Sequence, residues 1–353
     1  MLQHAPRRLT RTVIALISVF ALVAACGDDD TGSGPAVTGS GTPDLGTLQV
    51  AFASSQVAPA NFVQIANGEG FYAALGLKVE IKVLNSPQAT QALIAGQLDI
   101  AHAASPGINA ALQGAPLKAI YTATPLGPYW VVAKPEIKDY AGLAGKVVGV
   151  YSTTGTLVAD TTSVLQRHGV DAKSAKVSFS AAGGVNDQSE LAAIKSGAYD
   201  AAVVSAVGLL AAQQQGLNVL GDFGDLPTMD WSVWTTQSLL QKRAAAIQAF
   251  VTGTIMGAKV YTQNPDRALK YVAAGLSSSG TADDTSTALA KNVMAKLQPI
   301  LTPDGVPQAG QWTDAVNRRK AGVQNATSTP EGIADWSYAQ SAAKTLQDNG
   351  FKP

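Results

Sequence analysis

Two ten-residue stretches decide the fold of this chain: ALIAGQLDIA at residues 92–101 and AIKSGAYDAA at residues 193–202, offset by 101 residues. Each predicts the end of a helix that a glycine stops, followed by an aspartate and a short buried strand. One interpretation is that short helix–strand loops often look alike. The other is that the chain contains two similar α/β lobes, with a ligand cleft where their strand ends face each other.

Strand-like and helix-like segments alternate on both sides of these stretches. Apolar runs predict strands, and N-cap residues, prolines and glycine stops bound the helices between them. This alternation indicates a mostly parallel sheet covered by helices. We expect strands at 48–52, 78–83, 98–101, 117–121, 146–151 and 201–204. We expect helices at 86–96, 105–114, 157–167, 187–197 (opened by an Asp187–Glu190 capping box), 244–276 (interrupted at Asn264-Pro265) and 285–297.

The charge balance and the rarity of cysteine and histidine exclude several classes of protein. Lys+Arg and Asp+Glu number 25 each, and no basic cluster follows the N-terminal segment, which argues against a nucleic-acid partner. Cys26 is the only cysteine, so the chain has no internal disulfide. His102 and His168 are the only histidines besides His4, which nearly excludes metal clusters and histidine-based triads. We expect no cofactor and no metal.

The N-terminal segment has the features of a bacterial lipoprotein signal. Three arginines within the first 11 residues precede an apolar run at 13–23, which is short for a membrane span. LVAAC at 22–26 is a lipobox, so cleavage after a signal peptide of residues 1–25 would expose Cys26 for acylation. The alternative is an ordinary signal peptide with an incidental cysteine.

Residues 26–46 have the composition of a flexible tether. After Cys26 they are mainly Gly, Asp, Ser, Thr and Pro and offer almost nothing to bury. The mature protein is therefore expected on the extracytoplasmic face of the cell membrane, held by its lipid anchor.

Six segments between residues 48 and 275 recur in a characteristic order and spacing. They are GFYAALGLKVE at 70–80, ALIAGQLDIA at 92–101, GLAGKVVGV at 142–150, GAYDA at 197–201, IQAF at 247–250 and NPDRA at 264–268. No single segment is specific, but their order and spacing are. Together they resemble the substrate-binding proteins of ABC importers, in the nitrate/sulfonate/taurine group that includes thiamine-precursor binders.

This resemblance implies a type II periplasmic-binding-protein clamshell, an α/β fold of two lobes with two crossovers and a helical C-terminal region. We expect the crossovers near 124–130 and 224–231. Lobe one would then comprise residues 47–125 and 231–353, and lobe two residues 126–230.

Ligand contacts are expected just after the carboxyl ends of strands, where loops lead into helices and free N–H groups point outward. The turn at 152–156 is favoured because its hydroxyls and its glycine precede a helix N-terminus, which suits an oxyanion. Plain N-capping is the alternative for each hydroxyl, and hinge packing is the alternative for the tryptophans. The candidates are Ser54, Ser55, Ser105, Thr124, Ser152, Thr153, Thr154, Gly155, Thr156, Ser205, Trp130 and Trp231.

Other polar residues are interpreted as structural. Asp99 and Asp200 each follow a helix-stopping glycine at the entry end of a strand, and His102 lies at a buried strand. Many relatives place a bulky aromatic where this chain has Ser-Ala-Val-Gly at 205–208, which leaves room in the pocket and argues against nitrate. No arginine falls on the predicted cleft loops, so no bidentate clamp for a sulfonate or carboxylate is visible.

The main hypothesis is a monomeric, lipid-anchored binding protein that delivers a small sulfonate-, taurine- or nitrate-like anion to an ABC permease and its ATPase. An aromatic or pyrimidine-type ligand, as for a thiamine precursor, is the alternative, and so is a sensory lipoprotein. An enzyme resembling the thiamine-pyrimidine synthases is disfavoured, because the resemblance implies a cysteine-rich segment there and this chain lacks one.

Overall fold

Two five-stranded sheets form the framework of this protein, and each takes its strands from a different part of the chain. The computed structural model describes residues 43–52, 58–153, 156–182 and 186–353. The signal segment, Cys26 and the tether up to residue 42 therefore lie outside the described residues.

The first sheet has the strand order β2-β1-β3-β10-β4. β1 pairs in parallel with β2 and β3, whereas β10 runs antiparallel between β3 and β4. β3 is buried along its whole length, which suits Ile100 and Ala101 and places the ring of His102 in the interior. The strands are β1 (Thr47–Phe52), β2 (Lys78–Val83), β3 (Ile100–His102), β4 (Leu117–Thr122) and β10 (Ser232–Thr236).

The second sheet repeats this plan with the order β7-β6-β8-β5-β9. β6 is parallel to β7 and β8, and β5 runs antiparallel between β8 and β9. In each sheet the antiparallel strand therefore occupies the fourth position. The strands are β5 (Trp130–Ala133), β6 (Val147–Gly149), β7 (Ser178–Ser180), β8 (Ala201–Val204) and β9 (Asn218–Asp222).

The sequence repeat corresponds to equivalent structures in the two sheets. α3 (Ser86–Ile94) and α6 (Asp187–Ser196) are followed by Gly96 and Gly197, whose φ angles of 72° and 84° only glycine adopts readily. The carboxylate of Asp99 accepts the Gln49 N–H of β1 at 2.7 Å, and that of Asp200 accepts the Val147 N–H of β6 at 3.0 Å. Both aspartates thus hold a neighbouring strand in register, as the structural interpretation predicted.

Helices cover both sheets, and the predicted break at Asn264-Pro265 is confirmed. One detail was wrong: Asn186, not Asp187, caps α6, because its side chain accepts the Ser189 N–H at 2.9 Å. The remaining helices are α1 (Ala58–Gly68), α2 (Phe71–Ala74), α4 (Ala104–Leu112), α5 (Thr156–Arg167), α7 (Ala206–Gln214), α8 (Gln237–Lys242), α9 (Ala244–Gln263), α10 (Pro265–Leu276), α11 (Asp284–Leu297), α12 (Gln311–Lys320) and α13 (Ser337–Asp348).

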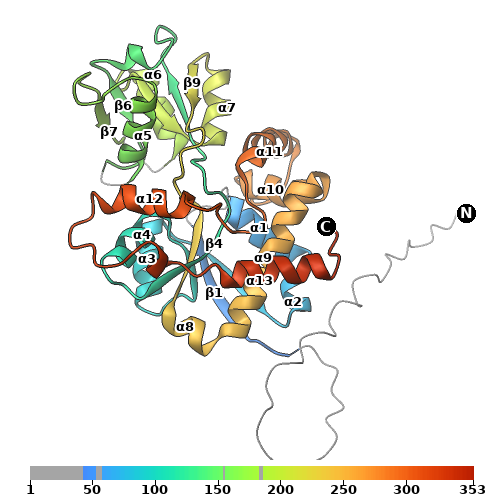
Figure 1. Ribbon diagram of the computed structural model, residues 1–353. Coiled ribbons are helices and arrows are strands. Elements are labelled where there is room, and N and C mark those ends of the chain that lie inside the picture. The colour runs from blue at the N-terminus through green and yellow to red at the C-terminus, as the bar shows by residue number, and fades with distance from the viewer. Residues whose placement is uncertain (1–42, 53–57, 154–155, 183–185) are drawn as a thin grey trace, which may run out of the picture.

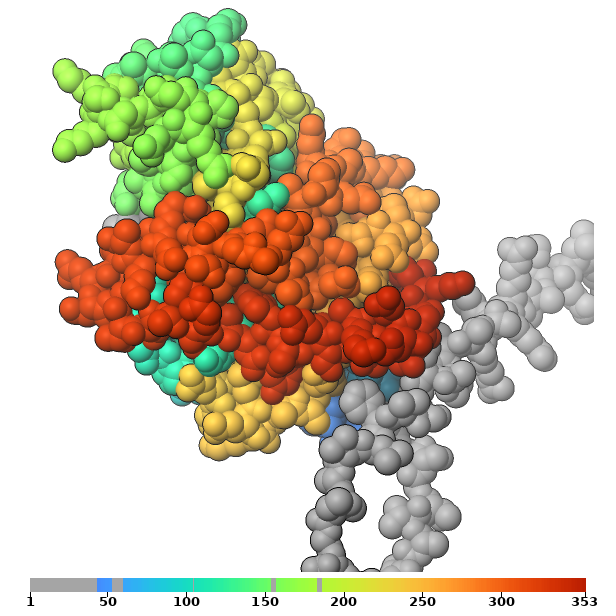
Figure 2. Space-filling view, viewed as in Figure 1, coloured from blue at the N-terminus to red at the C-terminus, as the bar shows by residue number. Residues whose placement is uncertain are grey.

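The two sheets belong to separate lobes, joined by chain segments at 123–129 and 223–231 (Figure 1). Lobe one consists of the first sheet with the helices packed on it, and lobe two consists of the second sheet with α5, α6 and α7. The C-terminal helices cover one face of lobe one, and α12 reaches the base of lobe two (Figure 2). This arrangement confirms the predicted fold class, a two-lobed α/β clamshell with two crossovers.

In the described part of the chain, no helix has both the length and the apolar character that crossing a bilayer requires.

Candidate functional site

The carboxyl edges of the two sheets face each other across the crossing segments. Ser232, which begins β10, pairs with Thr122 at the end of β4. Trp130, which begins β5, pairs with Val204 at the end of β8. Both crossings therefore leave their sheets at the edge where α4, α5 and α7 begin. We call the crossing segments and the first turns of these three helices the interlobe junction.

The two crossings are hydrogen-bonded to each other along their length. Ala123 N–H donates to Trp231 O at 3.0 Å, Thr228 N–H to Pro125 O at 2.9 Å and Phe223 N–H to Tyr129 O at 3.1 Å. The Thr124 hydroxyl makes its hydrogen bonds within the first crossing, since it donates to Leu126 O and accepts the Leu126 N–H, both at 3.1 Å. The chain at Met229 has a φ of 57°, an uncommon backbone conformation for a side chain of this size.

Several predicted ligand residues cannot be placed. Ser54, Ser55, Thr154 and Gly155 lie outside the described residues, and only the backbone of Thr156, the first residue of α5, is described. Ser152 and Thr153 lie between β6 and α5 at the carboxyl edge, with Thr153 exposed and Ser152 partly buried.

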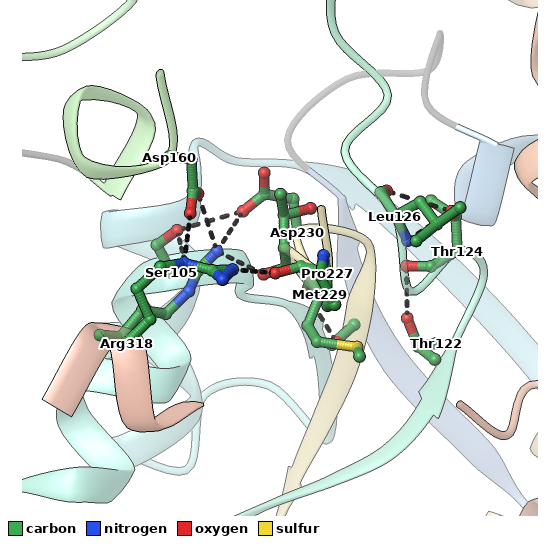
Figure 3. A network of polar contacts seen from close by, with 12 residues as sticks. Ser105, Thr122, Thr124, Leu126, Asp160, Pro227, Met229, Asp230 and Arg318 are labelled. Atoms are coloured by element: carbon green, nitrogen blue, oxygen red, sulfur yellow. Dashed lines mark hydrogen bonds and ion pairs between the residues drawn. The ribbon is translucent and has the colours of Figure 1, made fainter. Parts of the chain in front are cut away.

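Ser105, in the first turn of α4, lies in a buried polar network at the junction (Figure 3). Its hydroxyl donates to the Asp230 carboxylate at 3.3 Å and accepts a hydrogen bond from the Arg319 guanidinium. The guanidinium of Arg319 also donates to Thr228 O and to Asp230, the latter at 3.0 Å. Ser105 and Arg319 belong to lobe one and Asp230 to the crossing, so this part of the network fixes α4 and α12 to the hinge.

Asp160 joins this network from lobe two. Its carboxylate lies 3.3 Å from the guanidinium of Arg319 and 3.4 Å from that of Arg318, and about 1% of the Asp160 side chain is exposed. Burial raises the pKa of Asp160 to about 6, with Arg319 opposing the rise and Asp230 adding to it. The lobes thus meet through a buried cluster of two carboxylates and two guanidinium groups.

A second, apolar contact between the lobes lies on another side of the junction. α7 of lobe two contacts α11, which packs on α10 of lobe one. Leu209 and Ala212 of α7 share one apolar core with Ala290 and Val293 of α11. The two lobes are therefore held together at a polar and an apolar contact as well as by the crossings.

His102 is a buried histidine next to this network, as the sequence interpretation expected. Its Nε2 atom lies 2.9 Å from Asp230 O, and its ring stacks on Phe52 with the centroids 6.3 Å apart. Burial lowers the pKa of His102 to about 4. The ring is therefore neutral at physiological pH.

Ser205 caps α7, and the N-terminus of this helix already binds a carboxylate. The Asp187 carboxylate accepts the Ser205 N–H at 2.8 Å, the Ser205 hydroxyl at 2.6 Å and the Gly208 N–H at 3.1 Å, and also the Tyr151 hydroxyl. A Cβ atom at Gly208 would lie 2.4 Å from Asp187 Oδ1, so glycine is required there. The hydrogen-bond donors at the N-terminus of α7 thus already bind the carboxylate of Asp187.

Glu190 is a second acidic group on α6. It is fully buried, and burial raises its pKa to about 7, with the neighbouring Asp187 adding to the rise. Its carboxyl group packs against β6, where a Cβ atom at Gly149 would lie 2.4 Å from Glu190 Oε2. The acidic residues Asp160, Asp187 and Glu190 therefore all lie near the carboxyl edge of lobe two.

Aromatic residues line the crossing next to these carboxylates. Tyr129 packs edge-on against Tyr151, with ring centroids 6.2 Å apart, and against Phe223 at 5.5 Å. Burial raises the pKa of Tyr129 well above its usual value, and Asp230, Asp160 and Asp187 add to the rise. Trp130 and Trp231, the predicted cleft tryptophans, are 9% and 7% exposed and belong to the main apolar core. Tyr129 and Tyr151 are thus the aromatic residues next to the junction carboxylates, and Tyr151 donates a hydrogen bond to Asp187.

Sequence reasoning missed the arginines of α12. Arg319 interacts with Ser105 and Asp160, which precede it by 214 and 159 residues. The run of basic residues at 318–320 is the only signal, and basic residues are common in the last turn of a helix.

The surface has a hollow of about 450 Å³ between α1 and α10 and another of about 880 Å³ next to α9 and α13. Neither hollow is lined by a residue of the interlobe junction. Among the described residues, no group of three or more His, Cys, Asp or Glu side chains is arranged to hold a metal ion.

Solved structures share this fold over most of their length. The aliphatic sulphonate-binding protein SsuA of Escherichia coli aligns with a TM-score of 0.63 at 18% identity, covering 82% of this chain and 92% of that one. The alkanesulfonate-binding protein SsuA of Xanthomonas axonopodis pv. citri, solved with MOPS bound, aligns with a TM-score of 0.60 at 14% identity, covering 89% and 96%. A DSZB mutant in complex with biphenyl-2-sulfinic acid aligns with a TM-score of 0.58 at 15% identity, covering 85% and 99%.

No curated protein sequence matches this chain. The model of one family, described as NMT1/THI5 like, matches residues 60–268, more than half of the 353 residues. This match covers most of both sheets, both crossings and the acidic edge of lobe two. The chain therefore belongs to the NMT1/THI5-like family.

Proposed function

We propose that this chain is an extracytoplasmic solute-binding protein that delivers a small solute to an ABC permease and its ATPase. The observation that carries this proposal is the junction, where the carboxyl edges of two matching lobes meet across two hydrogen-bonded crossings. A ligand that contacts both lobes there would stabilise their closed arrangement. The permease would then distinguish the closed, loaded form from the open one.

A lipid anchor at Cys26 is part of this proposal. The lipobox at 22–26 and the polar tether after it support attachment to the outer face of the cell membrane. A monomer tethered in this way can reach a permease in the same membrane.

For the ligand, we propose a small organic anion such as an alkanesulfonate or taurine. Proteins with this fold include sulfonate binders, and one of them was solved with MOPS. In this chain, Arg318 is the partly exposed cation at the junction, whereas Arg319 is buried between Asp160 and Asp230, and a guanidinium group matches an oxyanion well. The negative group of the ligand is therefore expected on the side of α12.

A second ligand class, an aromatic or pyrimidine-type molecule, is favoured by lobe two. Asp187 fills the N-terminus of α7, where an anion would otherwise bind, and Tyr129 and Tyr151 offer rings for stacking. A neutral or amino-bearing ring would suit these partners better than an anion would.

Transport is proposed in preference to catalysis or sensing. The DSZB complex shares the fold and binds a sulfinic acid, so catalysis is the first alternative to consider. This chain has a single cysteine, in the lipobox, and a neutral, hydrogen-bonded His102 at the junction. A sensory lipoprotein would use the same lobes, and genes for a permease and an ATPase beside this one would favour transport.

A thermal-shift screen of the mature chain tests the ligand class. The panel would contain alkanesulfonates, taurine, nitrate, aminopyrimidines and aromatic carboxylates at equal ionic strength. A ligand of the native state at 100 times its Kd stabilises the protein by about 2.7 kcal/mol, which is a shift of several degrees. Stabilisation by sulfonates supports the first class, and stabilisation by aminopyrimidines alone supports the second. A chain that none of them stabilises contradicts both.

A further inference from the structure

Among the described residues, Asp160 is the side chain of lobe two that joins the polar contact between the lobes. Among the partners described for Arg319, Ser105 belongs to lobe one and Thr228 and Asp230 to the crossing, whereas Asp160 alone comes from lobe two. If the lobes separate, Arg319 keeps Asp230 as its counter-ion and Asp160 moves into water. Separation therefore leaves no buried charge unpaired, which removes the main cost of breaking a buried ion pair.

We call the arrangement in which Asp160 contacts Arg319 the closed form. It is less favourable for Asp160 than for Arg319. The carboxylates of Asp160 and Asp230 share one guanidinium nitrogen, at 3.3 and 3.0 Å, so each also repels the other. Asp160 has lost almost all of its contact with water and has the longer of these two contacts. A proton on Asp160 would remove this repulsion and most of the desolvation cost.

We propose that closure of the two lobes is coupled to protonation of Asp160: the closed form takes up a proton at this carboxyl group, and separation of the lobes releases it.

The direction of the pH effect follows from the two environments of this carboxyl group. In the closed form, burial raises the pKa of Asp160 to about 6, whereas in water the value is 3.8. The form that binds the proton more tightly is favoured as the pH falls. Closure thus becomes more favourable as the pH falls below about 6, and the effect is complete near the ordinary pKa of 3.8. A difference of about two pKa units shifts the closure equilibrium by at most about a hundredfold.

Several other charged or titratable groups lie around Asp160. Arg318 and Arg319 of α12 contact its carboxylate, and the pKa of Tyr129 is raised well above its usual value. Asp230, from the crossing, is the other carboxylate on the same guanidinium. His102, which contacts Asp230, has a pKa lowered to about 4. Glu190 titrates near pH 7 inside lobe two and therefore needs its own control.

The test measures the distance between the lobes with two spin labels and double electron–electron resonance. The labels are placed at Lys173→Cys in lobe two and Asp314→Cys on α12, both exposed, in the mature chain carrying Cys26→Ala. In this parent we expect a short distance at pH 5 and a growing population of longer distances at pH 8. Asp160→Asn mimics the protonated carboxyl group and should give the short distance at both pH values.

Two matched controls accompany this variant. Asp348→Asn removes a carboxylate that pairs with Lys344 on the surface of α13, where the side chains are 58% and 74% exposed, and should respond as the parent does. Glu190→Gln should also keep the response, because Glu190 packs within lobe two.

The proposal is overturned if the parent gives the same distances at pH 5 and pH 8, or if Asp160→Asn still responds to pH. Longer distances for Asp160→Asn at both pH values would also overturn it, because they would mean that the ion pair itself closes the lobes. If Asp160→Asn does not fold, as judged by circular dichroism, the distances of the parent and of Glu190→Gln at pH 5 and pH 8 still test the proposal. A response that Glu190→Gln abolishes would assign the proton to Glu190 and contradict the proposal.

Discussion

At the scale of single residues, the acidic edge of lobe two makes the stability of this protein depend on pH. Glu190 is fully buried and its pKa is raised to about 7. Because the folded chain binds this proton more tightly than the unfolded chain does, the stabilising contribution is present at low pH and is lost as the pH rises through about 7. Asp160, with a pKa raised to about 6, also makes the free energy of unfolding fall as the pH rises.

Glu190→Gln should therefore raise the free energy of unfolding at pH 8 by about 1–2 kcal/mol and leave it nearly unchanged at pH 5. Urea unfolding of both proteins at the two pH values measures this difference. A variant that is less stable than the parent at pH 8 would mean that the ionised carboxylate has a partner that stabilises it.

Asp187 should be the residue that keeps external anions away from the N-terminus of α7. Asp187→Ala removes the acceptor of the Ser205 and Gly208 N–H groups and should lower the free energy of unfolding by about 1–2 kcal/mol. Sulfate should then restore part of the loss by binding the vacated donors. Thermal unfolding in sodium sulfate and in sodium chloride of equal ionic strength tests this. Equal melting temperatures of the variant in the two salts would argue against an anion site at α7.

Some residues of the candidate site could be predicted from the sequence, but their interaction partners could not. The candidates Ser105 and Ser205 were identified because both follow a strand end, and this position depends only on local order. That Arg319 and Asp187 are their partners was not predicted, because these residues come from other helices and are brought close only by the packing of the whole chain. Asp187 was instead assigned to a capping box, whereas Asn186 is the N-cap of α6.

At the scale of secondary structure elements, the two copies of the helix–glycine–aspartate–strand unit are equivalent. Gly96 and Gly197 both have positive φ, and a Cβ atom at either position would meet no other atom within 4 Å. The cost of a side chain there is therefore backbone strain alone. This equivalence could be predicted from the sequence, because the unit is local and both copies keep the glycine and the aspartate.

Gly96→Ala and Gly197→Ala should each lower the free energy of unfolding by about 1 kcal/mol, because alanine is strained at positive φ. Chemical denaturation of the two variants measures both values. A cost at one site several times that at the other would show that the two loops are not equivalent.

At the scale of the whole molecule, the order of the elements was enough to predict two lobes, but the contacts between them were not predictable. The crossings follow from strand order, whereas the Asp160–Arg319 contact and the contact of α7 with α11 join helices that no local pattern connects. The C-terminal region was expected to be helical. That α12 would return to the junction depended on the packing of Trp312 and Val316 against lobe one.

The proposed anchor concerns the molecule as a whole. Cys26→Ala should release the protein from the membrane fraction without changing its circular dichroism spectrum, because the predicted tether contains almost no residues that a core would bury. Metabolic labelling with a fatty acid and cell fractionation measure this. Fatty-acid label that persists in the alanine variant would exclude Cys26 as the acylation site.

If the two lobes bind one small organic anion between them, isothermal titration calorimetry of the mature chain with ethanesulfonate and taurine will detect it. We expect saturable binding of at least one of them, with a stoichiometry of one and a Kd of about 1–100 μM, or about −5.5 to −8 kcal/mol. No saturable heat with either sulfonate, from a protein shown to be folded, would contradict it.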